Sequence, residues 1–276
     1  MKYLFFDIDG TLLSHSNGIA ESAVNALKKA QENGHKIFLN TGRSLAEISP
    51  AFDQFNFDGY VCAAGSYIKI GDQVILNKII SEKDVSYLIE IMDSIGLGYG
   101  LEGEEFTFFS DEVYLGYVSR MKEAFEKGSC QPNYKYEPIQ FMIQPEFVKN
   151  AHEYSKNPIA INKLLLYAKD INHLKELENK LERDFHIINY GTFGELLNYG
   201  VNKGTGIVEV IKYYGASLED TISFGDSLND LEMLQISNVG VAMENASVEV
   251  KEISDMIAGH INKDGLANAM KDLNLI

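Results

Sequence analysis

Two aspartates separated by one residue follow a run of apolar and aromatic residues near the start of the chain, in YLFFDIDGTLL, residues 3–13. Such a run predicts a buried strand, so Asp7 and Asp9 stand where that strand ends. Carboxylates this close repel each other unless a cation lies between them or one of them keeps a proton. The pair therefore indicates a metal site or an acid–base pair, although a single aspartate here is more often a turn former or helix cap.

Three further segments place polar residues directly after a predicted strand or at the start of a predicted helix. The residues are Thr41, Gly42 and Arg43, then Lys203, and then Asp226, Asn229 and Asp230. Because the carboxyl ends of parallel strands meet at one edge of a sheet, we expect these side chains to converge on the aspartates. Taken singly, each segment has a simpler explanation as a helix cap, a capped turn or a solvated charge. The four segments together favour a functional site.

Lys203 is the most informative of these residues. It stands between Asn202 and GTGIVEVI, where a helix is predicted to begin. The partial positive charge at a helix N-terminus disfavours a cation there by roughly 0.3–1 kcal/mol. A lysine in this position therefore indicates an anion close by, such as a phosphate or a phosphorylated aspartate.

Phosphoryl transfer is the chemistry that requires this combination of groups. Mg²⁺ prefers oxygen ligands, and Asp7 and Asp226 offer two carboxylates for it. One aspartate attacks phosphorus and forms an acyl-phosphate, while a second carboxyl gives a proton to the departing alkoxide and later takes one from water. Thr41, backbone N–H groups near Gly42, and Lys203 are suited to hold the phosphoryl oxygens.

The overall charge limits the possible partners. Lysine and arginine total 24 against 40 aspartates and glutamates, a net charge of −16, which repels nucleic acid and anionic membranes. No apolar run reaches the roughly 20 residues of a membrane-spanning helix, and no signal-peptide cleavage region follows the N-terminus. Cys62 and Cys130 form no recognisable pattern, which favours a reducing compartment, so we expect a cytoplasmic protein. Oligomeric state has no signature in this sequence.

Both ends of the chain alternate short apolar runs with helical patterns, which predicts a parallel, doubly wound α/β sheet with helices on both faces. Strands are predicted at 2–6, 36–40, 59–65, 221–226 and 239–243, with a hairpin over 66–76 that turns at Gly71-Asp72. Helices are predicted at 20–33, 201–215 and 228–237, and another opens in TGRSLAEI, residues 41–48.

The middle of the chain has a different pattern, which predicts an inserted α+β unit. Helices predicted at 83–95, 112–127 and 171–184 interleave with strands at 104–110, 138–144, 162–170 and 185–190. The last of these strands is expected to pair with 194–198 across Gly191-Thr192. We therefore divide the chain into a discontinuous core of residues 1–82 and 187–276 and an insert of residues 83–186.

The segments DIDGTLL, TGR, NKG and GDSLND, in that order, resemble the four motifs of the haloacid dehalogenase superfamily, and the resemblance extends over the whole chain. More narrowly, the sequence is similar to the Cof-type phosphatases, whose large α/β cap of class IIB lies between the second and third motifs. The resemblance implies a Rossmann-like parallel-sheet core and an inserted cap domain that selects the substrate. It also implies a Mg²⁺-dependent phosphatase that acts on small phosphate monoesters through an aspartyl-phosphate.

Carried over residue by residue, the resemblance implies Asp7 as nucleophile and metal ligand. It implies Asp9 as general acid/base, in contact with Mg²⁺ through its backbone carbonyl, and Lys203 as the group that neutralises Asp7 and the phosphate. The other matching residues are Thr41, Gly42, Arg43 and Asn229 at the phosphate or substrate, Asp226 at the metal, and Asp230, which reaches the metal through water.

Two segments depart from the pattern of the family. The segment CAAGSYI has Ala64 before Gly65, where such proteins often have Asn-Gly. The segment AMENA places Glu244 before Asn245, where MGNA is commoner. Neither departure removes a catalytic group, and both lie near loops expected to shape the substrate entrance, so they bear on specificity.

The resemblance leaves several substrates open: hexose and pentose phosphates, pyridoxal phosphate and flavin mononucleotide. The insert is rich in tyrosine, and its tyrosines include Tyr114, Tyr117, Tyr134 and Tyr136. They are interpreted as ordinary core and surface of the cap, with stacking against a substrate ring as the alternative.

Three other functions would use part of the same set of residues. A sugar phosphomutase must rebind a bisphosphate, and no lysine- or arginine-rich stretch of the insert favours that. A non-catalytic phospho-receiver is far shorter and has no use for an insert of about a hundred residues, the size of a typical domain. A metal-binding glycosyltransferase with a DxD pair leaves Lys203 and GDSLND unexplained.

Overall fold

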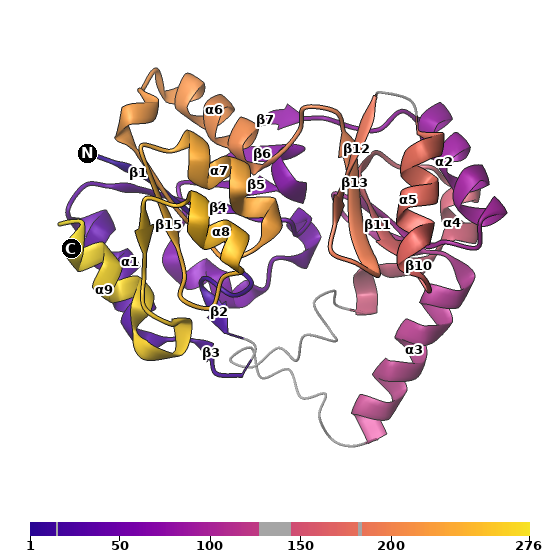
Figure 1. Ribbon diagram of the computed structural model, residues 1–276, viewed down its shortest axis with the longest axis horizontal. Helices are drawn as coiled ribbons and strands as arrows, with labels where there is room; N and C mark the ends of the chain where they lie inside the picture. The colour runs from indigo at the N-terminus through magenta and orange to yellow at the C-terminus, as the bar shows by residue number, and fades with distance from the viewer. Residues whose placement is uncertain (15, 127–144, 182–183) are drawn as a thin grey trace.

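The computed structural model describes residues 1–14, 16–126, 145–181 and 184–276. The described strands form a sheet of eight strands, a sheet of six and a two-stranded hairpin. The larger sheet is built from the two ends of the chain and the smaller one from its middle (Figure 1). Within these ranges, every helix is too short or too polar to span a membrane.

The eight-stranded sheet has the order β16-β15-β14-β1-β4-β5-β6-β7. β1 pairs in parallel with β4 on one side and with β14 on the other, so the direction of strand addition reverses at β1. Ligands of such sheets bind beyond the carboxyl ends of the strands at this point. The strands are β1 (Tyr3–Phe6), β4 (Lys36–Asn40), β5 (Gly59–Cys62), β6 (Tyr67–Ile70), β7 (Gln73–Asn77), β14 (Thr221–Gly225), β15 (Val239–Ala242) and β16 (Met256–Ile257).

Helices cover both faces of this sheet, and β1 is buried on both. Leu4 and Phe6 belong to the core beneath α1 and α9, whereas Tyr3 and Phe5 belong to the core beneath α6, α7 and α8. A strand buried on both faces needs a continuous apolar run, which YLFF provides. The helices are α1 (Glu21–Glu32), α6 (Lys203–Tyr214), α7 (Leu231–Ile236), α8 (Val248–Ile253) and α9 (Gly265–Asp272), and the hairpin after β1 is β2 (Leu13–Ser14) with β3 (Gly18–Ile19).

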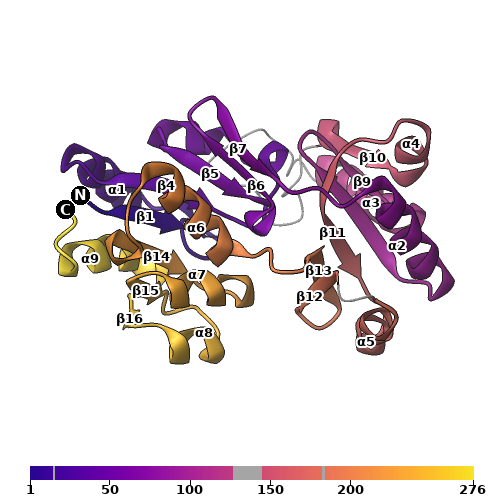
Figure 2. The same ribbon diagram turned by 90° about the horizontal axis from the view of Figure 1, so that it is seen from above.

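The six-stranded sheet has the order β10-β9-β8-β11-β13-β12 and lies beside the larger sheet when the molecule is seen from above (Figure 2). Its strands are β8 (Gly98–Gly103), β9 (Thr107–Phe109), β10 (Val148–Asn150), β11 (Ile161–Tyr167), β12 (Phe185–Asn189) and β13 (Phe193–Asn198). Its helices are α2 (Glu82–Ser94), α3 (Asp111–Glu126), α4 (Ala151–Lys156) and α5 (Ile171–Lys180). We call the larger sheet with its helices the core, and α2 to β13 the cap.

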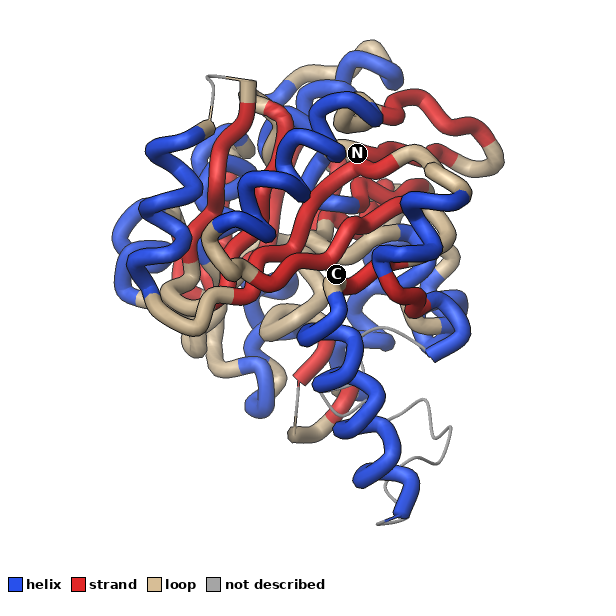
Figure 3. The backbone as a smooth tube through the Cα atoms, turned by 90° about the vertical axis from the view of Figure 1, so that its right-hand side faces the viewer, coloured by secondary structure: helices blue, strands red, loops and turns tan. Residues whose placement is uncertain are grey.

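The two faces of the cap sheet have different surroundings. Leu164 and Leu166 of β11 face the apolar core formed with α2, α4 and α5, whereas Leu165 and Tyr167 face an aromatic cluster on the opposite side. Because successive side chains of a strand point to opposite faces, Lys163 shares the face of Leu165 and Tyr167. Strands lie toward the middle of the molecule and helices around them (Figure 3). α3 packs against the cap-sheet face that carries Leu165 and Tyr167.

Most of the expected elements are present. The predicted α/β class is confirmed, and the two hairpins turn at Gly71-Asp72 and across Gly191-Thr192 as expected. The helix expected in residues 41–48 is wrong: Leu45–Glu47 and Pro50–Phe55 form two 3₁₀ segments, because Pro50 has no N–H to continue a helix through Ile48. β8 was not expected because its three glycines weaken the strand pattern. The strand expected at 138–144 lies outside the described residues.

The return of the chain from the cap to the core differs from the predicted boundary at residue 187. β12 pairs with β13 and β13 with β11, so the whole hairpin through Asn198 belongs to the cap sheet. The predicted boundary falls within β12 (Phe185–Asn189) and so divides the hairpin. We propose a core of residues 1–80 and 199–276 with a cap between them.

A left-handed turn follows β5 and adjoins the start of α6. Ala63, Ala64 and Gly65 all have positive φ, at 47°, 52° and 98°. A residue with a Cβ pays about 1–2 kcal/mol for this conformation. A Cβ at Gly65 would overlap the carbonyl of Asn202, so only glycine fits there. The surrounding structure therefore holds a strained turn in place, which is typical of functional regions.

We expect Ala64→Val to lower the free energy of unfolding by about 2 kcal/mol or more, because a β-branched residue fits neither the positive φ nor the fully buried site. Ala64→Gly should change it by less than about 1 kcal/mol, since relief of backbone strain offsets the lost methyl packing. Urea unfolding measures both, with Ala23→Gly in α1 as a control that loses roughly 1 kcal/mol. Wild-type stability of Ala64→Val would contradict the left-handed turn.

Candidate active site

The first site loop leaves β1 at its carboxyl end. The N–H of Asp7 donates to the carbonyl of Phe224 at 3.0 Å, which extends the pairing of β1 with β14 by one residue. The carbonyl of Ile8 then accepts from the N–H groups of Thr11, Leu12 and Leu13, at 3.3, 3.0 and 2.7 Å. This tight turn holds Asp7 and Asp9 at the end of the strand, as their spacing predicts.

Lys203 lies beside Asp7, at the first turn of α6. Its Nζ is 2.7 Å from Oδ1 of Asp7 and 2.6 Å from Oδ1 of Asp230, and its side chain is 1% exposed. Burial lowers the pKa of Lys203, but Asp230 and Asp7 outweigh burial and hold the pKa above its ordinary value. A capping box of Asn202 and Thr205 fixes the start of the helix, so the ammonium group is held rigidly. The anion expected near Lys203 is thus, in this structure, a pair of carboxylates.

Asp230 is fully buried and bonded on both oxygens. Oδ1 contacts Lys203, while Oδ2 accepts from the N–H groups of Asp226 and Ser227, each at 2.9 Å. The latter bonds belong to a capping box that shapes the loop after β14. Asp230 therefore orients Lys203 and the loop that carries Asp226; its predicted contact with a metal through water stays a prediction.

The acidic cluster fits a divalent cation. Carboxylate oxygens of Asp7, Asp226 and Asp230 all lie within 4.8 Å of one another. Burial raises the pKa of Asp7 well above its ordinary value, with Lys203 acting against it, and burial together with Asp230 raises the pKa of Asp226 to about 7. Repulsion among the carboxylates adds to the effect of burial, and a cation bound between Asp7 and Asp226 would relieve it. The donors are hard oxygens, the ligand type that Mg²⁺ prefers.

Gly10 and Asn245 complete the surroundings of Asp226. Gly10 has a φ of +89°, and a Cβ there would overlap the carboxylate of Asp226. The Asn245 amide donates to the carbonyl of Gly10 at 2.8 Å and to Asp226 at 3.4 Å. Glycine at this position therefore allows Asp226 to lie against the first loop.

The second site loop follows β4 and consists of Thr41, Gly42 and Arg43. Its carbonyls are all engaged: Ala64 N–H donates to Thr41 at 3.0 Å, Lys163 Nζ to Gly42 at 2.6 Å, and Ala63 N–H to Arg43 at 2.7 Å. The N–H of Thr41 bonds to Val61 and that of Arg43 to the Thr41 hydroxyl. Among the described residues, the Gly42 N–H has no acceptor, so it is the backbone donor of this loop that can meet a phosphate.

Arg43 binds Asp9 with two hydrogen bonds. Nε lies 2.9 Å from Oδ2 and Nη2 lies 2.8 Å from Oδ1, and the arginine side chain is 2% exposed. Nη1 donates to the carbonyl of Glu47 at 3.1 Å. The assignment of Arg43 to phosphate or substrate binding stays a prediction, and the structure adds a fixed orientation for the carboxyl of Asp9.

Asn229 lies at the edge of the same space, from the loop after β14. Its Oδ1 accepts from the Ser227 hydroxyl at 2.8 Å, and its Nδ2 lies 3.4 Å from Oε2 of Glu195 in the cap. A Cβ at Gly42 would be 3.1 Å from that amide nitrogen. The two residues predicted to contact phosphate are therefore neighbours, and both meet the cap.

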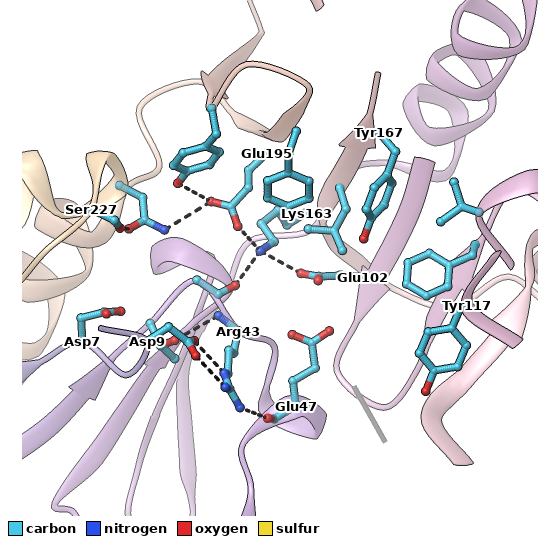
Figure 4. A pocket seen from close by; sticks show the side chains of 18 of the residues that line it. Asp7, Asp9, Arg43, Glu47, Glu102, Tyr117, Lys163, Tyr167, Glu195 and Ser227 are labelled. Atoms are coloured by element: carbon cyan, nitrogen blue, oxygen red, sulfur yellow. Dashed lines mark hydrogen bonds and ion pairs between the residues drawn. The ribbon is translucent and has the colours of Figure 1, made fainter. Parts of the chain in front are cut away.

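A cavity of about 410 Å³ lies between core and cap (Figure 4). Asp7, Asp9, Thr41, Gly42, Arg43 and Asn229 line it from the core. The cap contributes an aromatic wall that includes Phe109, Tyr117, Tyr167, Tyr190 and Phe193. A group of charged residues lies between these two sides, namely Glu47, Glu102, Lys163 and Glu195.

Sequence analysis did not identify Glu47, Glu102, Lys163 and Glu195 as site residues. One signal was available for Lys163, which interrupts the apolar strand NKLLLY. A lysine in a buried strand is almost always paired with an acidic group. Of the cap tyrosines singled out, Tyr117 lines the cavity and Tyr114 packs against the cluster behind it. Tyr134 and Tyr136 lie outside the described residues.

Neither departure from the family pattern lines the cavity. Ala64 is completely buried in the left-handed turn, and Glu244 is exposed beside Asn245. Ala64 acts on the site through the hydrogen bond of its N–H with Thr41. The expectation that these positions shape the substrate entrance finds no support in the cavity lining.

We expect Gly10→Ala to weaken Mg²⁺ binding about tenfold or more, because the new Cβ displaces the Asp226 carboxylate. Isothermal titration calorimetry with Mg²⁺ alone measures the affinity. Gly71→Ala is the matched control: it also has a positive φ, of 53°, but no atom lies within 4 Å of its Cβ. Both variants should lose stability through the backbone, and equal Mg²⁺ affinity in the two would contradict the contact between Gly10 and Asp226.

Comparison with known proteins agrees with this geometry. A model of the haloacid dehalogenase-like hydrolases matches residues 4–270. YkrA of Bacillus subtilis (strain 168), whose name gives it as a candidate phosphatase, is 29% identical over 100% of this chain and 98% of its own. The pyridoxal phosphate phosphatase YbhA of Escherichia coli (strain K12) is 24% identical, over 96% of each chain. The structure of the subclass IIB sugar phosphatase BT4131 superposes with a TM-score of 0.79 at 28% identity, covering 100% of both chains.

Proposed function

Given that the chain belongs to the haloacid dehalogenase-like hydrolases and is a phosphatase of the Cof type, we propose that it hydrolyses small phosphate monoesters with Mg²⁺ as cofactor. The observation that carries this proposal is the contact of Asp7 with Lys203 beside Asp226, at the point where the strand order reverses. A buried carboxylate next to a fixed ammonium and a cation site is suited to attack phosphorus, because the positive charges offset repulsion between nucleophile and phosphate.

In the first step, an oxygen of Asp7 forms a bond with phosphorus while the bond from phosphorus to the leaving oxygen breaks. Asp9 gives its proton to that oxygen. Both oxygens of the Asp9 carboxyl accept from Arg43 in this structure, so one of these hydrogen bonds must break for the transfer. In the second step, water attacks the aspartyl-phosphate, Asp9 takes the proton, and the bond between phosphorus and Asp7 breaks. Mg²⁺, held by Asp7, Asp226 and the Asp9 carbonyl, would neutralise charge on the phosphoryl oxygens.

Four groups are proposed to hold the phosphoryl oxygens: the Thr41 hydroxyl, the Gly42 N–H, the Asn229 amide and the Lys203 ammonium. Thr41, Gly42 and Asn229 line one cavity, and the N–H of Gly42 is unused within the described residues. Lys203 contacts Asp7, which lines the same cavity. Such donors act most strongly in a site shielded from water, where charge develops during transfer. Thr41 and Lys203 are buried and Gly42 is partly buried, which favours this role.

The leaving group is proposed to lie against the cap and to carry hydroxyl groups. The carboxyls of Glu47, Glu102 and Glu195 offer hydrogen-bond acceptors on that side, and the aromatic wall offers a flat apolar surface. Sugar phosphates match both features, and a ring phosphate such as pyridoxal phosphate or flavin mononucleotide matches the second. The activities named for BT4131 and YbhA support these two classes.

A phosphomutase is the alternative with the same aspartates. It must bind the second phosphate of a bisphosphate on the cap side, where Lys163 is paired with Glu102 and Glu195 and where Arg120 of α3 also lines the cavity. The two buried carboxyls beside Lys163 disfavour a second anion there. Hydrolysis is therefore the proposed reaction.

The proposed location is the cytoplasm, and the free, buried thiol of Cys62 agrees with it.

We expect Asp7→Asn to lower kcat/KM for any phosphate monoester by about 10⁴-fold or more, because the amide cannot form the acyl-phosphate. The variant should fold, since Lys203 keeps Asp230 as a partner. Phosphate release from a broad monoester panel measures the effect, and circular dichroism checks the fold. Asp72→Asn, at the exposed hairpin turn, is the matched control. Activity retained by folded Asp7→Asn would exclude Asp7 as the nucleophile.

The loss of turnover in Asp9→Asn should depend on the leaving group. For a hexose phosphate, whose alkoxide needs a proton, we expect turnover to fall by about 10²–10⁴-fold, and for p-nitrophenyl phosphate much less. Mg²⁺ affinity by calorimetry should stay unchanged, because the metal contact uses the backbone carbonyl. An equal loss with both substrates would count against Asp9 as the acid.

A further inference from the structure

Lys163 is a buried lysine with three protein oxygens around its ammonium group. Its Nζ donates to Oε1 of Glu195 and to the carbonyl of Gly42, each at 2.6 Å, and forms an ion pair with Oε2 of Glu102 at 3.0 Å (Figure 4). Protein oxygens thus surround the ammonium group, although Lys163 lines the cavity.

The Lys163–Glu195 pair belongs to the cap, yet it contacts the core at two defined places. Lys163 bonds to the Gly42 carbonyl, and Glu195 lies 3.4 Å from the Asn229 amide. Gly42 permits this approach, because a Cβ there would come within 3.2 Å of Oε1 of Glu195. The two contacts fall on two of the four residues proposed to hold phosphoryl oxygens.

The pair is ionised, and the hydrolytic steps do not use it. Burial would raise the pKa of Glu195, but Lys163 holds it below the ordinary value, with Lys203 and Asn229 adding to the effect. Charges buried this deeply cost free energy, and an apolar pair often packs as well. Their presence beside a reactive site therefore suggests a function other than stability.

The second site loop shows what that function is. Two of its three carbonyls are bonded from within the core, by the N–H groups of Ala63 and Ala64, and only the middle one is bonded from the cap. The middle carbonyl belongs to the peptide that also carries the Arg43 N–H, and this N–H donates to the Thr41 hydroxyl at 3.1 Å. Without Lys163, the peptide after Gly42 can rotate about its flanking bonds, since glycine offers little resistance.

We propose that Lys163 is a positioning residue that, with Glu195, holds the Gly42 peptide and the Asn229 amide in place for the phosphoryl group and contacts no part of the substrate. The proposal rests on the phosphatase function proposed above. It predicts that a cap residue affects phosphate itself, even when no leaving group is present. A lysine that bound the leaving group would instead affect only the substrates that reach it.

The test compares Lys163→Met with wild type, using inorganic phosphate as a competitive inhibitor. We expect its inhibition constant to rise about tenfold or more, and kcat/KM for acetyl phosphate to fall by a similar factor, because neither molecule has a leaving group that fills the cap. Tyr67→Phe is the matched control. It removes a 2.8 Å hydrogen bond between core and cap, from Tyr67 to Glu104, without touching the second site loop, and should leave both values unchanged.

Lys163→Met leaves Glu195 buried without its lysine, so the double variant Lys163→Met/Glu195→Gln provides a neutral version of the site. It should show the same weakened phosphate inhibition with better thermal stability. An unchanged inhibition constant in either folded variant, with or without a higher KM for a sugar phosphate, overturns the proposal. Absence of monoester hydrolysis by the wild-type protein would instead overturn the proposed function, so the two failures are distinguishable.

Discussion

Repulsion among buried carboxylates is the constraint on which the rest of this structure depends. Asp7, Asp226 and Asp230 are brought together from two distant parts of the chain, and Lys203 is the ammonium that contacts two of them. The arrangement requires a site where strands end, helices begin and backbone N–H groups are unused. The reversal of strand order at β1 supplies that site, because β14 brings Asp226 to the side of Asp7.

Core and cap both contact the second site loop. The core fixes the ends of this loop through the left-handed turn at Ala63 and Ala64, and the cap fixes its centre through Lys163. Strain in the turn and charge burial in the cap are both costly, and both act on this loop. This convergence gives a physical reason why alanines adopt positive φ here and why a lysine interrupts an apolar strand.

The sequence predicts the catalytic side of this arrangement better than the cap side. Asp7, Asp9, Lys203 and Asp226 lie at strand and helix ends, where pattern and spacing are informative, and the structure brings them together as expected. Lys163, Glu102 and Glu195 lie within strands of the cap, and only strand register decides which face they share. Register depends on the pairing of distant segments, which a single sequence does not reveal. Pro50 is a sequence feature that disfavours a helix over residues 41–48, whereas the apolar pattern before it favours one.

The pairing of β1 with both β4 and β14 also has a consequence for how the chain folds during synthesis. Residues 3–6 emerge from the ribosome early, but their second neighbour, residues 221–225, emerges only after the entire cap. The cap is continuous in sequence and can fold as a unit while β1 still exposes one apolar edge. The acidic site therefore cannot form before residues 226–230 have been synthesised. A nascent chain that stops short of β14 lacks Asp226 and Asp230 and with them part of the acidic cluster.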